Sequence, residues 1–296
     1  YLTNPDYLGN MVDIAQMAEV CHRHGVLLVV DNAHGAYLRF LNPSRHPMSL
    51  GADMCCDSAH KTLPALTGGA YLHVSQSLPL VFRDQAKNAM LMYGSTSPSY
   101  LILQSLDLVN VYLVKGYRHQ LKECIRQTEE LKAALLEHGY ELTGDEPLKV
   151  TICPKSYGYT GWELDGLLRL ESIYCEYSDP DHLVMMISPD IPEPRLLQLR
   201  QILLELPRQT PILEPPPPFH KCDVVMSIRE ASLYTCRTMS ATDAMGMVLA
   251  SPSVGCPPAV PIAICGERIT LQTVRTFQYY GIQTITALAD EVPEKS

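Results

Sequence analysis

The chain has 296 residues and a mass of 33.0 kDa, a size typical of about two domains. With 46% apolar and 19% charged residues, it can bury a substantial core and does not have the composition of a disordered segment. Because 23 basic residues stand against 32 acidic ones, the net charge of -9 argues against a nucleic-acid-binding or anionic-membrane-binding surface and is compatible with a cationic ligand.

The first 115 residues have the pattern of a parallel α/β domain. Four apolar residues recur at the spacing of a helix face, and Gly25 after them is a natural stop: Ile14, Met17, Ala18 and Cys21. The apolar run at 26–30 (VLLVV) predicts a strand covered on both faces, and this run ends at Asp31. Because ligands of open α/β sheets bind at the carboxyl ends of strands, Asp31 is a candidate site residue. Further short strands are expected at 52–56 and 70–74.

The middle of the chain is expected to begin with helix and then to alternate. Helix signals dominate residues 101–138, and Gly139 closes that segment. The following residues predict a helix at 163–171, a strand at 183–187 and a helix at 194–206. Residues 116–210 are therefore interpreted as a linking helix followed by a small α/β domain.

The last part of the chain follows a proline-rich segment. Prolines at 211 and 215–218 predict a stiff, extended linker over residues 211–218. Beyond it, a capping box at 240–243 predicts a short helix, and further patterns predict a strand at 259–265, a helix at 270–280 and a strand at 283–286. Residues 219–296 are thus expected to form a separate C-terminal α+β domain.

The residues with chemical potential gather around Asp31 and the segment Ser58-Ala59-His60-Lys61. A lysine placed just after a strand can form a Schiff base with a carbonyl cofactor. Pyridoxal phosphate needs such an amine, an acid beside its pyridine nitrogen and donors for its phosphate, and Lys61, Asp31 and the pair Ser58 and His60 fit these three roles. On these residues alone, an ordinary surface lysine and a core strand that happens to end in aspartate explain the pattern equally well.

Longer motifs favour the interpretation as a pyridoxal-phosphate site. The chain contains VVDNAHGAYLRF (29–40), GADMCCDSAHKTLPALTGGAYLHV (51–74) and STSPSYLILQSLD (95–107). These segments closely resemble the pyridoxal-phosphate-dependent ornithine/lysine/arginine decarboxylase family, and the resemblance returns at 226–231 and 256–269. It implies an α/β fold with a fold-type-I, transferase-like large domain that ends near residue 115, followed by the small α/β domain and the C-terminal domain.

The resemblance also implies a role for each matching residue. Lys61 corresponds to the lysine that holds the cofactor, Asp31 to the partner of the pyridine nitrogen, and Ser58 and His60 to cofactor and phosphate contacts. His34 corresponds to a residue near the ring or its 3-hydroxyl. Ser95 matches a hydroxyl that reaches the phosphate of the neighbouring subunit, and Thr96 becomes its replacement if the alignment slips by one residue.

The implied activity is decarboxylation of a basic amino acid, with arginine first and then lysine or ornithine, in polyamine biosynthesis. The resemblance further implies a cytoplasmic homodimer or larger homo-oligomer with a shared active site. Alternatives are another fold-type-I enzyme, such as an aminotransferase or a carbon–carbon lyase, and a catalytically inactive fragment or assembly subunit. The C-terminal domain argues against a simple aminotransferase, which lacks that part.

The family pattern has a long stretch before the position of Tyr1, so the resemblance predicts a large domain that is incomplete at its N-terminus. That stretch supplies the first strands, a phosphate-binding loop at a helix N-terminus and a residue that stacks on the ring. Three positions also depart from the usual pattern: Asn32, Ile228 and Ala259. Asn32 stands in place of the more usual glutamate.

Neither a metal site nor a membrane segment is predicted. His22 and His24 are two residues apart on a helix and point in divergent directions, and the ten cysteines show no C-x-x-C spacing. Cys55 and Cys56 are expected to be core residues of a strand. No run reaches the roughly 18 apolar residues of a membrane span, and the scattered cysteines are typical of reduced thiols in the cytosol.

Overall fold

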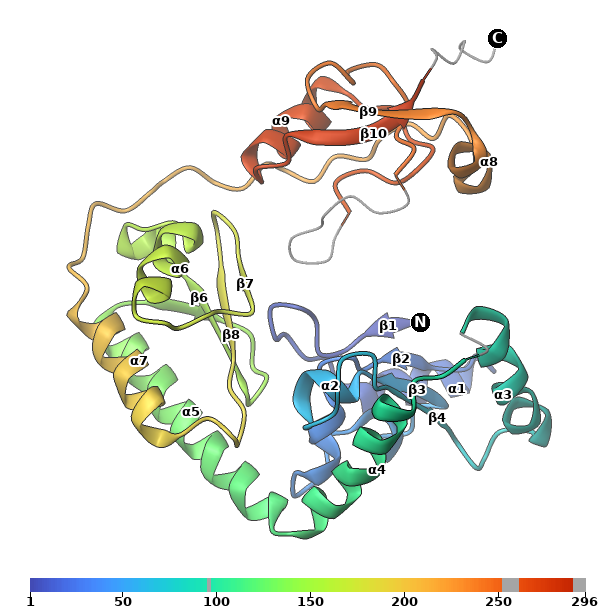
Figure 1. The fold of residues 1–296 in the computed structure, drawn as a ribbon, viewed down its shortest axis with the longest axis vertical. Coiled ribbons are helices and arrows are strands. Elements are labelled where there is room, and N and C mark those ends of the chain that lie inside the picture. The colour runs from blue at the N-terminus through green and yellow to red at the C-terminus, as the bar shows by residue number, and fades with distance from the viewer. Residues whose placement is uncertain (95–96, 252–260, 290–296) are drawn as a thin grey trace. The chain divides into compact units, whose positions relative to one another are not determined.

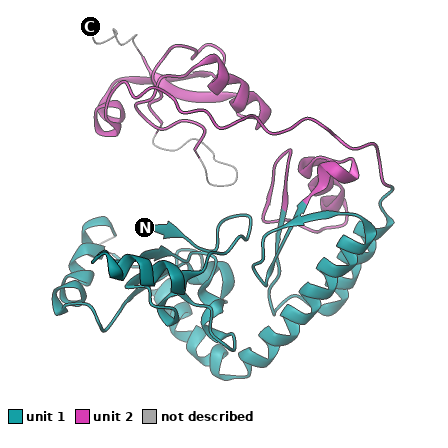
Figure 2. Ribbon diagram, turned by 180° about the vertical axis from the view of Figure 1, so that it is seen from behind, with its two compact units in different colours: residues 1–152, 184–207 teal, residues 153–183, 208–296 magenta. Residues whose placement is uncertain are grey.

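The computed structural model describes residues 1–94, 97–251 and 261–289. It divides the chain into two compact units, shown in Figure 2. Unit 1 comprises residues 1–152 and 184–207, and unit 2 comprises residues 153–183 and 208–296. The four-part domain organisation expected from the sequence stays a prediction.

The first sheet of unit 1 carries the predicted site residues. Its strands, in spatial order, are β1 (Leu2–Thr3), β2 (Val29–Asp31), β3 (Met54–Asp57) and β4 (Tyr71–Val74). β1, β2 and β3 are parallel, whereas β4 runs antiparallel to β3. Helix α1 (Ile14–Arg23) packs against this sheet through Ile14 and Ala18, which contact a core that includes Leu28 and Val30. The predicted helix with its stop near Gly25 is confirmed.

The strand expected at 26–30 is shorter and begins later, at Val29. Val26 and Leu27 are 55% and 38% exposed, so the run is not covered on both faces. The backbone explains the difference, because the Val26 N–H closes the turn after α1 and the Leu28 N–H donates to the Asp53 carboxylate at 2.8 Å. The Leu28 N–H is therefore not available to the sheet, although the Leu28 carbonyl accepts from the Met54 N–H of β3 at 3.3 Å.

Helices connect the sheet to the rest of unit 1 (Figure 1). In chain order they are η1 (Ala36–Phe40), η2 (Pro47–Ser49), α2 (Ala59–Thr62), α3 (Leu80–Tyr93), α4 (Tyr100–Val114), α5 (Tyr117–His138) and α7 (Glu193–Glu205). The helical stretch expected at 101–138 is interrupted at Gly116, whose φ of 94° separates α4 from α5. Helix α7 confirms the helix expected at 194–206, whereas α3 has no counterpart in the sequence prediction.

A second sheet has the order β5 (Glu141–Thr143), β6 (Lys149–Cys153), β8 (Leu183–Met186) and β7 (Tyr177–Ser178). The predicted strand at 183–187 corresponds to β8. Helices α5 and α7 pack together within unit 1, and the Tyr140 hydroxyl after α5 donates to the Leu203 carbonyl of α7 at 2.8 Å.

Unit 2 holds β7, two further elements from the middle of the chain and the C-terminal elements. Besides β7, they are η3 (Pro154–Tyr157), α6 (Gly161–Leu170), α8 (Ile228–Leu233), β9 (Cys236–Ser240), α9 (Leu271–Tyr279) and β10 (Thr284–Leu288). β9 and β10 pair antiparallel, and Phe277 and Val274 of α9 belong to the core cluster that also includes Ile285 of β10. Helices α6 and α9 and strand β10 confirm three sequence predictions.

Two predictions for the C-terminal part are wrong. Residues 240–243 open a turn instead of a helix: Ser240 is the last residue of β9, and although its hydroxyl accepts the Asp243 N–H at 3.0 Å, Gly246 with φ 85° ends the turn. The strand expected at 259–265 is absent over residues 261–265, and positions 259–260 lie outside the described residues.

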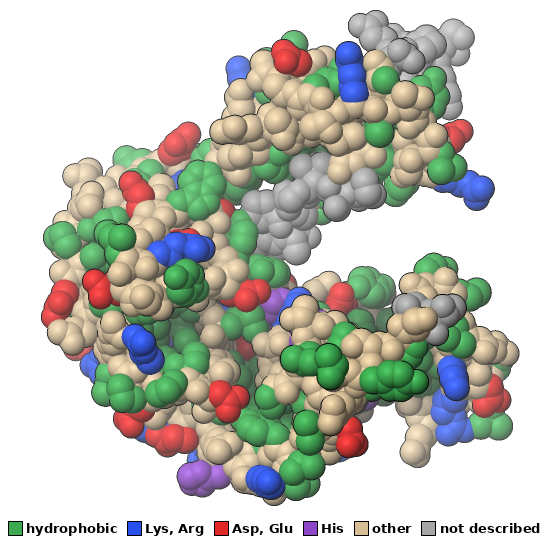
Figure 3. Space-filling model, viewed as in Figure 1, with side chains coloured by type: hydrophobic (Ala, Val, Ile, Leu, Met, Phe, Trp, Pro, Cys, Tyr) green, Lys and Arg blue, Asp and Glu red, His purple; other side chains and the backbone are tan. Residues whose placement is uncertain are grey.

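The surface mixes side-chain types. Apolar side chains are scattered between acidic and basic ones on the face shown in Figure 3. Among the described residues, no helix combines the length and apolar character that crossing a membrane requires. No two cysteines in the described part of the chain form a disulfide with each other. Cys55 is buried as expected, but Cys56 is exposed, so the expectation that both are core residues is wrong for Cys56.

Candidate active site

Asp31 is the last residue of β2, at the carboxyl end of a parallel strand as the sequence predicts. Its Oδ1 atom accepts the Ala33 N–H at 3.1 Å and the Cys56 thiol at 3.7 Å, while its Oδ2 atom accepts the Tyr1 hydroxyl at 2.8 Å. Cys56 is the residue directly opposite Asp31 on β3. These contacts hold the carboxylate at the carboxyl end of β2. The lysine segment follows the carboxyl end of β3, the neighbouring strand.

The segment from Ser58 to Lys61 follows β3, the neighbouring parallel strand. Ser58 is the N-cap of the short helix α2 but makes no side-chain capping bond, so its hydroxyl is not used to terminate the helix. Lys61 lies on α2, and its Nζ is 3.1 Å from Nε2 of His34, which comes from the loop after β2. The structure therefore brings Lys61 and His34 together, and both stem from adjacent strand ends.

His34 is buried, with 4% of its surface exposed. Burial, and then the positive charges of Lys149 and Lys61, lower the pKa of His34 to about 3, so the imidazole is neutral near pH 7. Since Lys61 donates to Nε2, the ring proton lies on Nδ1, and this buried atom has no hydrogen-bond partner among the described residues. A buried donor without an acceptor costs about 1–3 kcal/mol, which an acceptor on a bound ligand would recover.

His60 is oriented by the loop that precedes β4. Its Nδ1 lies 3.0 Å from the Gly69 carbonyl, which can only accept, so Nδ1 carries a proton and donates it. The neutral ring then has its lone pair on Nε2. Donation from Nε2 to a phosphate, the role expected from the sequence, therefore requires the protonated imidazolium.

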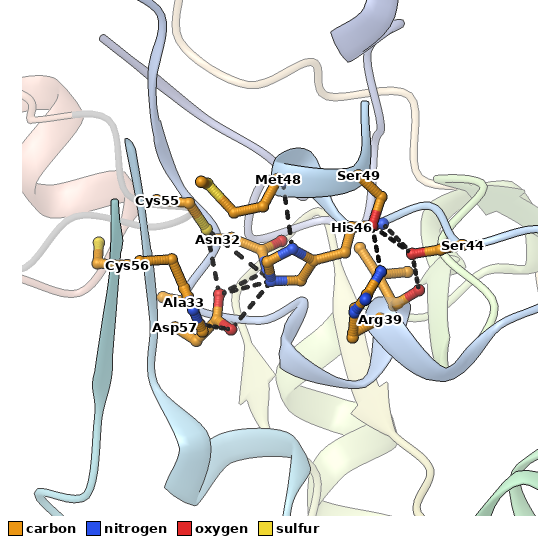
Figure 4. A network of polar contacts seen from close by, with 12 residues as sticks. Asn32, Ala33, Arg39, Ser44, His46, Met48, Ser49, Cys55, Cys56 and Asp57 are labelled. Carbon is orange, nitrogen blue, oxygen red and sulfur yellow. Dashed lines mark hydrogen bonds and ion pairs between the residues drawn. The ribbon is translucent and has the colours of Figure 1, made fainter. Parts of the chain in front are cut away.

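A buried polar cluster that sequence reasoning missed lies directly before this segment. Asp57, the last residue of β3, is 4% exposed, and its Oδ2 accepts from Nε2 of His46 at 3.0 Å and of His73 at 2.9 Å. Its Oδ1 accepts from Asn32 Nδ2 at 2.7 Å and from the Cys55 thiol at 3.3 Å. Figure 4 shows the imidazole of His46 directed at the Asp57 carboxylate, with Asn32 and Cys55 beside the same group.

This cluster explains one departure from the family pattern. Asn32 is fully buried and donates to Asp57, so a glutamate at position 32 would place a second carboxylate against the first. Gly35 is part of the same arrangement, because a Cβ atom there would lie 1.9 Å from the Asn32 side chain. The loop that carries His34 therefore needs a glycine at position 35.

The contacts of Asp57 predict that the free energy of unfolding depends measurably on acidic pH. Burial alone would raise its pKa, but hydrogen bonds from His46, His73 and Asn32 outweigh burial and hold the pKa below its usual range. The stabilisation is therefore complete near pH 7 and is lost as the pH falls below about 4. Asp57→Asn should lower the free energy of unfolding at pH 7 by about 1–3 kcal/mol, because the His46 donor loses its carboxylate partner.

Urea unfolding at pH 7 and pH 3.5 measures this effect. The difference between wild type and Asp57→Asn should shrink at the lower pH, whereas Asp84→Asn, at an exposed position of α3, should match the wild type at both. An Asp57→Asn protein as stable as the wild type at pH 7 would contradict the structural role of the cluster.

The remaining predicted site residues, Ser95 and Thr96, lie outside the described residues, as does Ala259. Their assignments stay predictions. The pair His22 and His24 does not form a common site, because Nε2 of His22 contacts Asp53 at 2.8 Å instead.

Comparison with known sequences gives a family match. The sequence model described as Orn/Lys/Arg decarboxylase, major domain, matches residues 1–155. An uncharacterized protein of Bacillus subtilis, YaaO, is 30% identical over 294 residues, which cover 93% of this chain and 60% of that protein. An arginine decarboxylase of the same organism is 28% identical over 295 residues, covering 92% of this chain and 59% of that enzyme. The chain thus spans about 60% of the length of these curated relatives.

Comparison with solved structures supports the fold. The constitutive lysine decarboxylase of E. coli matches with a TM-score of 0.71 at 16% identity, covering 97% of this chain and 57% of that one. A serine palmitoyltransferase of Sphingomonas wittichii matches with a TM-score of 0.54 at 13% identity, covering 69% of this chain and 53% of that one. The fold is therefore the fold-type-I, transferase-like α/β fold, and the chain belongs to the Orn/Lys/Arg decarboxylase family.

Proposed function

We propose that the protein decarboxylates a basic amino acid with pyridoxal phosphate as its cofactor. The observation that carries the proposal is the 3.1 Å distance between Nζ of Lys61 and Nε2 of His34. His34 lies on the loop that directly follows Asp31, the last residue of β2. An amine and a buried imidazole are in contact, and a carboxylate ends the strand that leads to the imidazole, at the carboxyl ends of parallel strands where this fold class binds ligands.

The residues fit the cofactor. Lys61 supplies the amine, Asp31 the acid for the pyridine nitrogen, and Ser58 a hydroxyl that no capping bond occupies. The unpaired Nδ1–H of His34 is a buried donor that an oxygen of the cofactor can accept. When bound, the cofactor supplies an electron sink for the pair of electrons that carbon dioxide leaves behind.

The protein's own residues then have defined tasks. Asp31 holds a proton at the ring nitrogen, and its contacts with Ala33 and Cys56 keep the carboxylate in place. Lys61 and His60 are the candidates for delivering a proton to the substrate carbon. His34 stays neutral, so it accepts from Lys61 without adding a positive charge next to the amine.

The substrate we propose first is arginine, followed by lysine and ornithine. Relatives that are named arginine decarboxylases support this order, and the net charge of -9 is compatible with a cationic substrate. An aminotransferase or carbon–carbon lyase on the same fold is the alternative, since serine palmitoyltransferase shares the fold. Thiols such as those of Cys55, Cys124 and Cys222 fit a reducing compartment, and we place the protein in the cytosol.

A substrate panel tests the activity. The protein loaded with pyridoxal phosphate is incubated with arginine, lysine, ornithine and, as controls, glutamate and alanine. Carbon dioxide release and the matching amine should appear with a basic substrate alone. Keto-acid formation without carbon dioxide would replace the proposal with an aminotransferase.

We further propose a homodimer or larger homo-oligomer. Helix α3 has no buried residue, and large apolar side chains of α3 and α4 are exposed in the single chain, namely Leu80, Val81, Met92, Tyr93, Tyr100 and Leu101. Patches of this kind mark interaction surfaces. A second copy of the chain would cover them.

Mixing two inactive variants tests the shared site. Lys61→Ala and Ser95→Ala subunits should each be inactive alone, because one lacks the cofactor lysine and the other the phosphate hydroxyl given to the neighbouring subunit. Equal mixing should restore about a quarter of wild-type activity, since about half of the dimers are hybrids with one intact site. No recovery under conditions in which labelled subunits demonstrably exchange would contradict the shared site.

A further inference from the structure

We propose that His46, Asp57 and His73 bind a divalent metal ion of the zinc class. This inference does not depend on the proposed decarboxylase activity. It rests on the local geometry of two strands and on the cavity in front of them, both within unit 1.

The sheet places the three side chains together. Cys55 and Asp57 are two residues apart on β3 and so lie on the same face of the sheet. His73 on β4 is paired directly with Cys55, which puts its imidazole on that face too. His46 precedes η2 and reaches the same carboxylate from the loop above the sheet.

The distances are close to those of a coordination site. Nε2 of His46 and Nε2 of His73 lie 3.0 and 2.9 Å from Oδ2 of Asp57, and the three ligand atoms are all within 4.8 Å of one another. With metal–ligand bonds of about 2.0–2.2 Å and tetrahedral angles, ligand atoms are roughly 3.3 Å apart, so a small opening of the cluster accommodates an ion. Two imidazoles and a carboxylate are a common ligand set of zinc.

The carboxylate is held in a way that suits a ligand. Its Oδ1 atom accepts from Asn32 and Cys55 and lies 3.3 Å from Nε2 of His46, so Oδ2 is the oxygen closer to both imidazoles and the one offered to an ion. Partners of this kind orient ligands and raise metal affinity. The cluster also borders a cavity of about 640 Å³, whose wall includes His46, Asp57 and His73 together with Arg39 and Asn110. The His73 side chain is 38% exposed, so an ion can enter and keep a coordination position open to the cavity.

Binding has a structural cost at both histidines. Nε2 of His73 and Nε2 of His46 each donate a proton to Asp57, and a metal ion on these atoms displaces both protons, the one on His73 moving to its Nδ1. The Met48 N–H donates to Nδ1 of His46 at 3.3 Å, which places the ring proton on Nε2 in the metal-free protein. When the metal takes Nε2, that proton moves to Nδ1 and the Met48 N–H must turn away. The long donor–acceptor distance makes this a weak contact to give up, and we expect an affinity below that of zinc sites that need no such rearrangement.

Metal titration with a matched pair of variants tests the site. His73→Phe removes a ligand nitrogen but keeps a ring that packs edge-on against His46. His22→Phe is the control, because it removes an imidazole that contacts the carboxylate of Asp53 without a second histidine. Zinc binding is measured calorimetrically on the full chain, and Co²⁺ is used as a visible probe of coordination. Circular dichroism confirms that each variant is folded, and Asp57→Asn provides a second ligand variant.

The wild type should bind one more equivalent of Zn²⁺ than His73→Phe or Asp57→Asn, and it should show a Co²⁺ ligand-field spectrum that both lack. Loss of a group that merely orients a ligand costs about 10- to 100-fold in affinity, so loss of a ligand should cost at least about 100-fold. His22→Phe should bind like the wild type. Equal Zn²⁺ binding by the wild type and His73→Phe, or an equal loss in His22→Phe, would overturn the proposal.

Discussion

The decarboxylation rate of Lys61→Ala is expected to fall by about 10²–10⁴-fold or more. Positioned proton transfer alone contributes a factor of this size. Lys61 is exposed on a four-residue helix, and its Nζ contacts His34. Removing its side chain therefore takes little from packing, and the unfolding transition should stay unchanged. The loss of activity would then report on chemistry and not on folding.

Reduction with borohydride locates the lysine that holds the cofactor. In the loaded wild type the label should appear on the peptide that contains Lys61, and it should be absent from Lys61→Ala. Lys221→Ala, at an exposed position of unit 2, serves as the control and should keep both label and turnover. Labelling of any other lysine in the wild type would reject the assignment of Lys61.

Local patterns in the sequence were sufficient to predict much of the site-bearing sheet. The apolar run before Asp31 and the spacing of α1 both depend on neighbouring residues, and the structure places Asp31 at a strand end as expected. The position where β2 starts could not be predicted in this way, because it depends on a contact with a residue far away in the sequence. The Asp53 carboxylate takes the Leu28 N–H from 25 positions away, and no pattern within the run indicates this.

The buried cluster around Asp57 shows a second limit. Strand alternation places Cys55 and Asp57 on one face, and this part was available from the sequence. The approach of His73 depends on β4 running antiparallel to β3, although a helix connects the two strands and the preceding strands are parallel. His46 arrives from an irregular loop, so neither histidine could be assigned to Asp57 before the fold was known.

The longer motifs carried the prediction of the active site, and the geometry refines it. His34 and Lys61 are 27 positions apart and meet because β2 and β3 are neighbouring parallel strands. The tautomer of His60 could not be read from the sequence, since it is set by the Gly69 carbonyl in the following loop. The roles of Ser95 and Thr96 still rest on the family resemblance.

The largest electrostatic effect is expected from Asp31→Asn, which should reduce turnover by about 10²–10³-fold, the size seen when one charge-stabilising partner is removed from an active site. The amide cannot keep a proton on the ring nitrogen, so the ring loses much of its capacity as an electron sink. The fold should persist, because the amide oxygen of the variant can still accept from the Ala33 N–H, as Oδ1 of the carboxylate does at 3.1 Å.

Separate measurements of binding and turnover identify this role. Asp31→Asn should retain cofactor absorbance at saturating pyridoxal phosphate while kcat falls, whereas Asp84→Asn, on the exposed surface of α3, should match the wild type in both. Asp31→Glu keeps the negative charge and should recover part of the lost kcat, which a purely structural role for the carboxylate does not predict. Near-normal turnover of Asp31→Asn would mean that another group protonates the ring, and the assignment of Asp31 would fall.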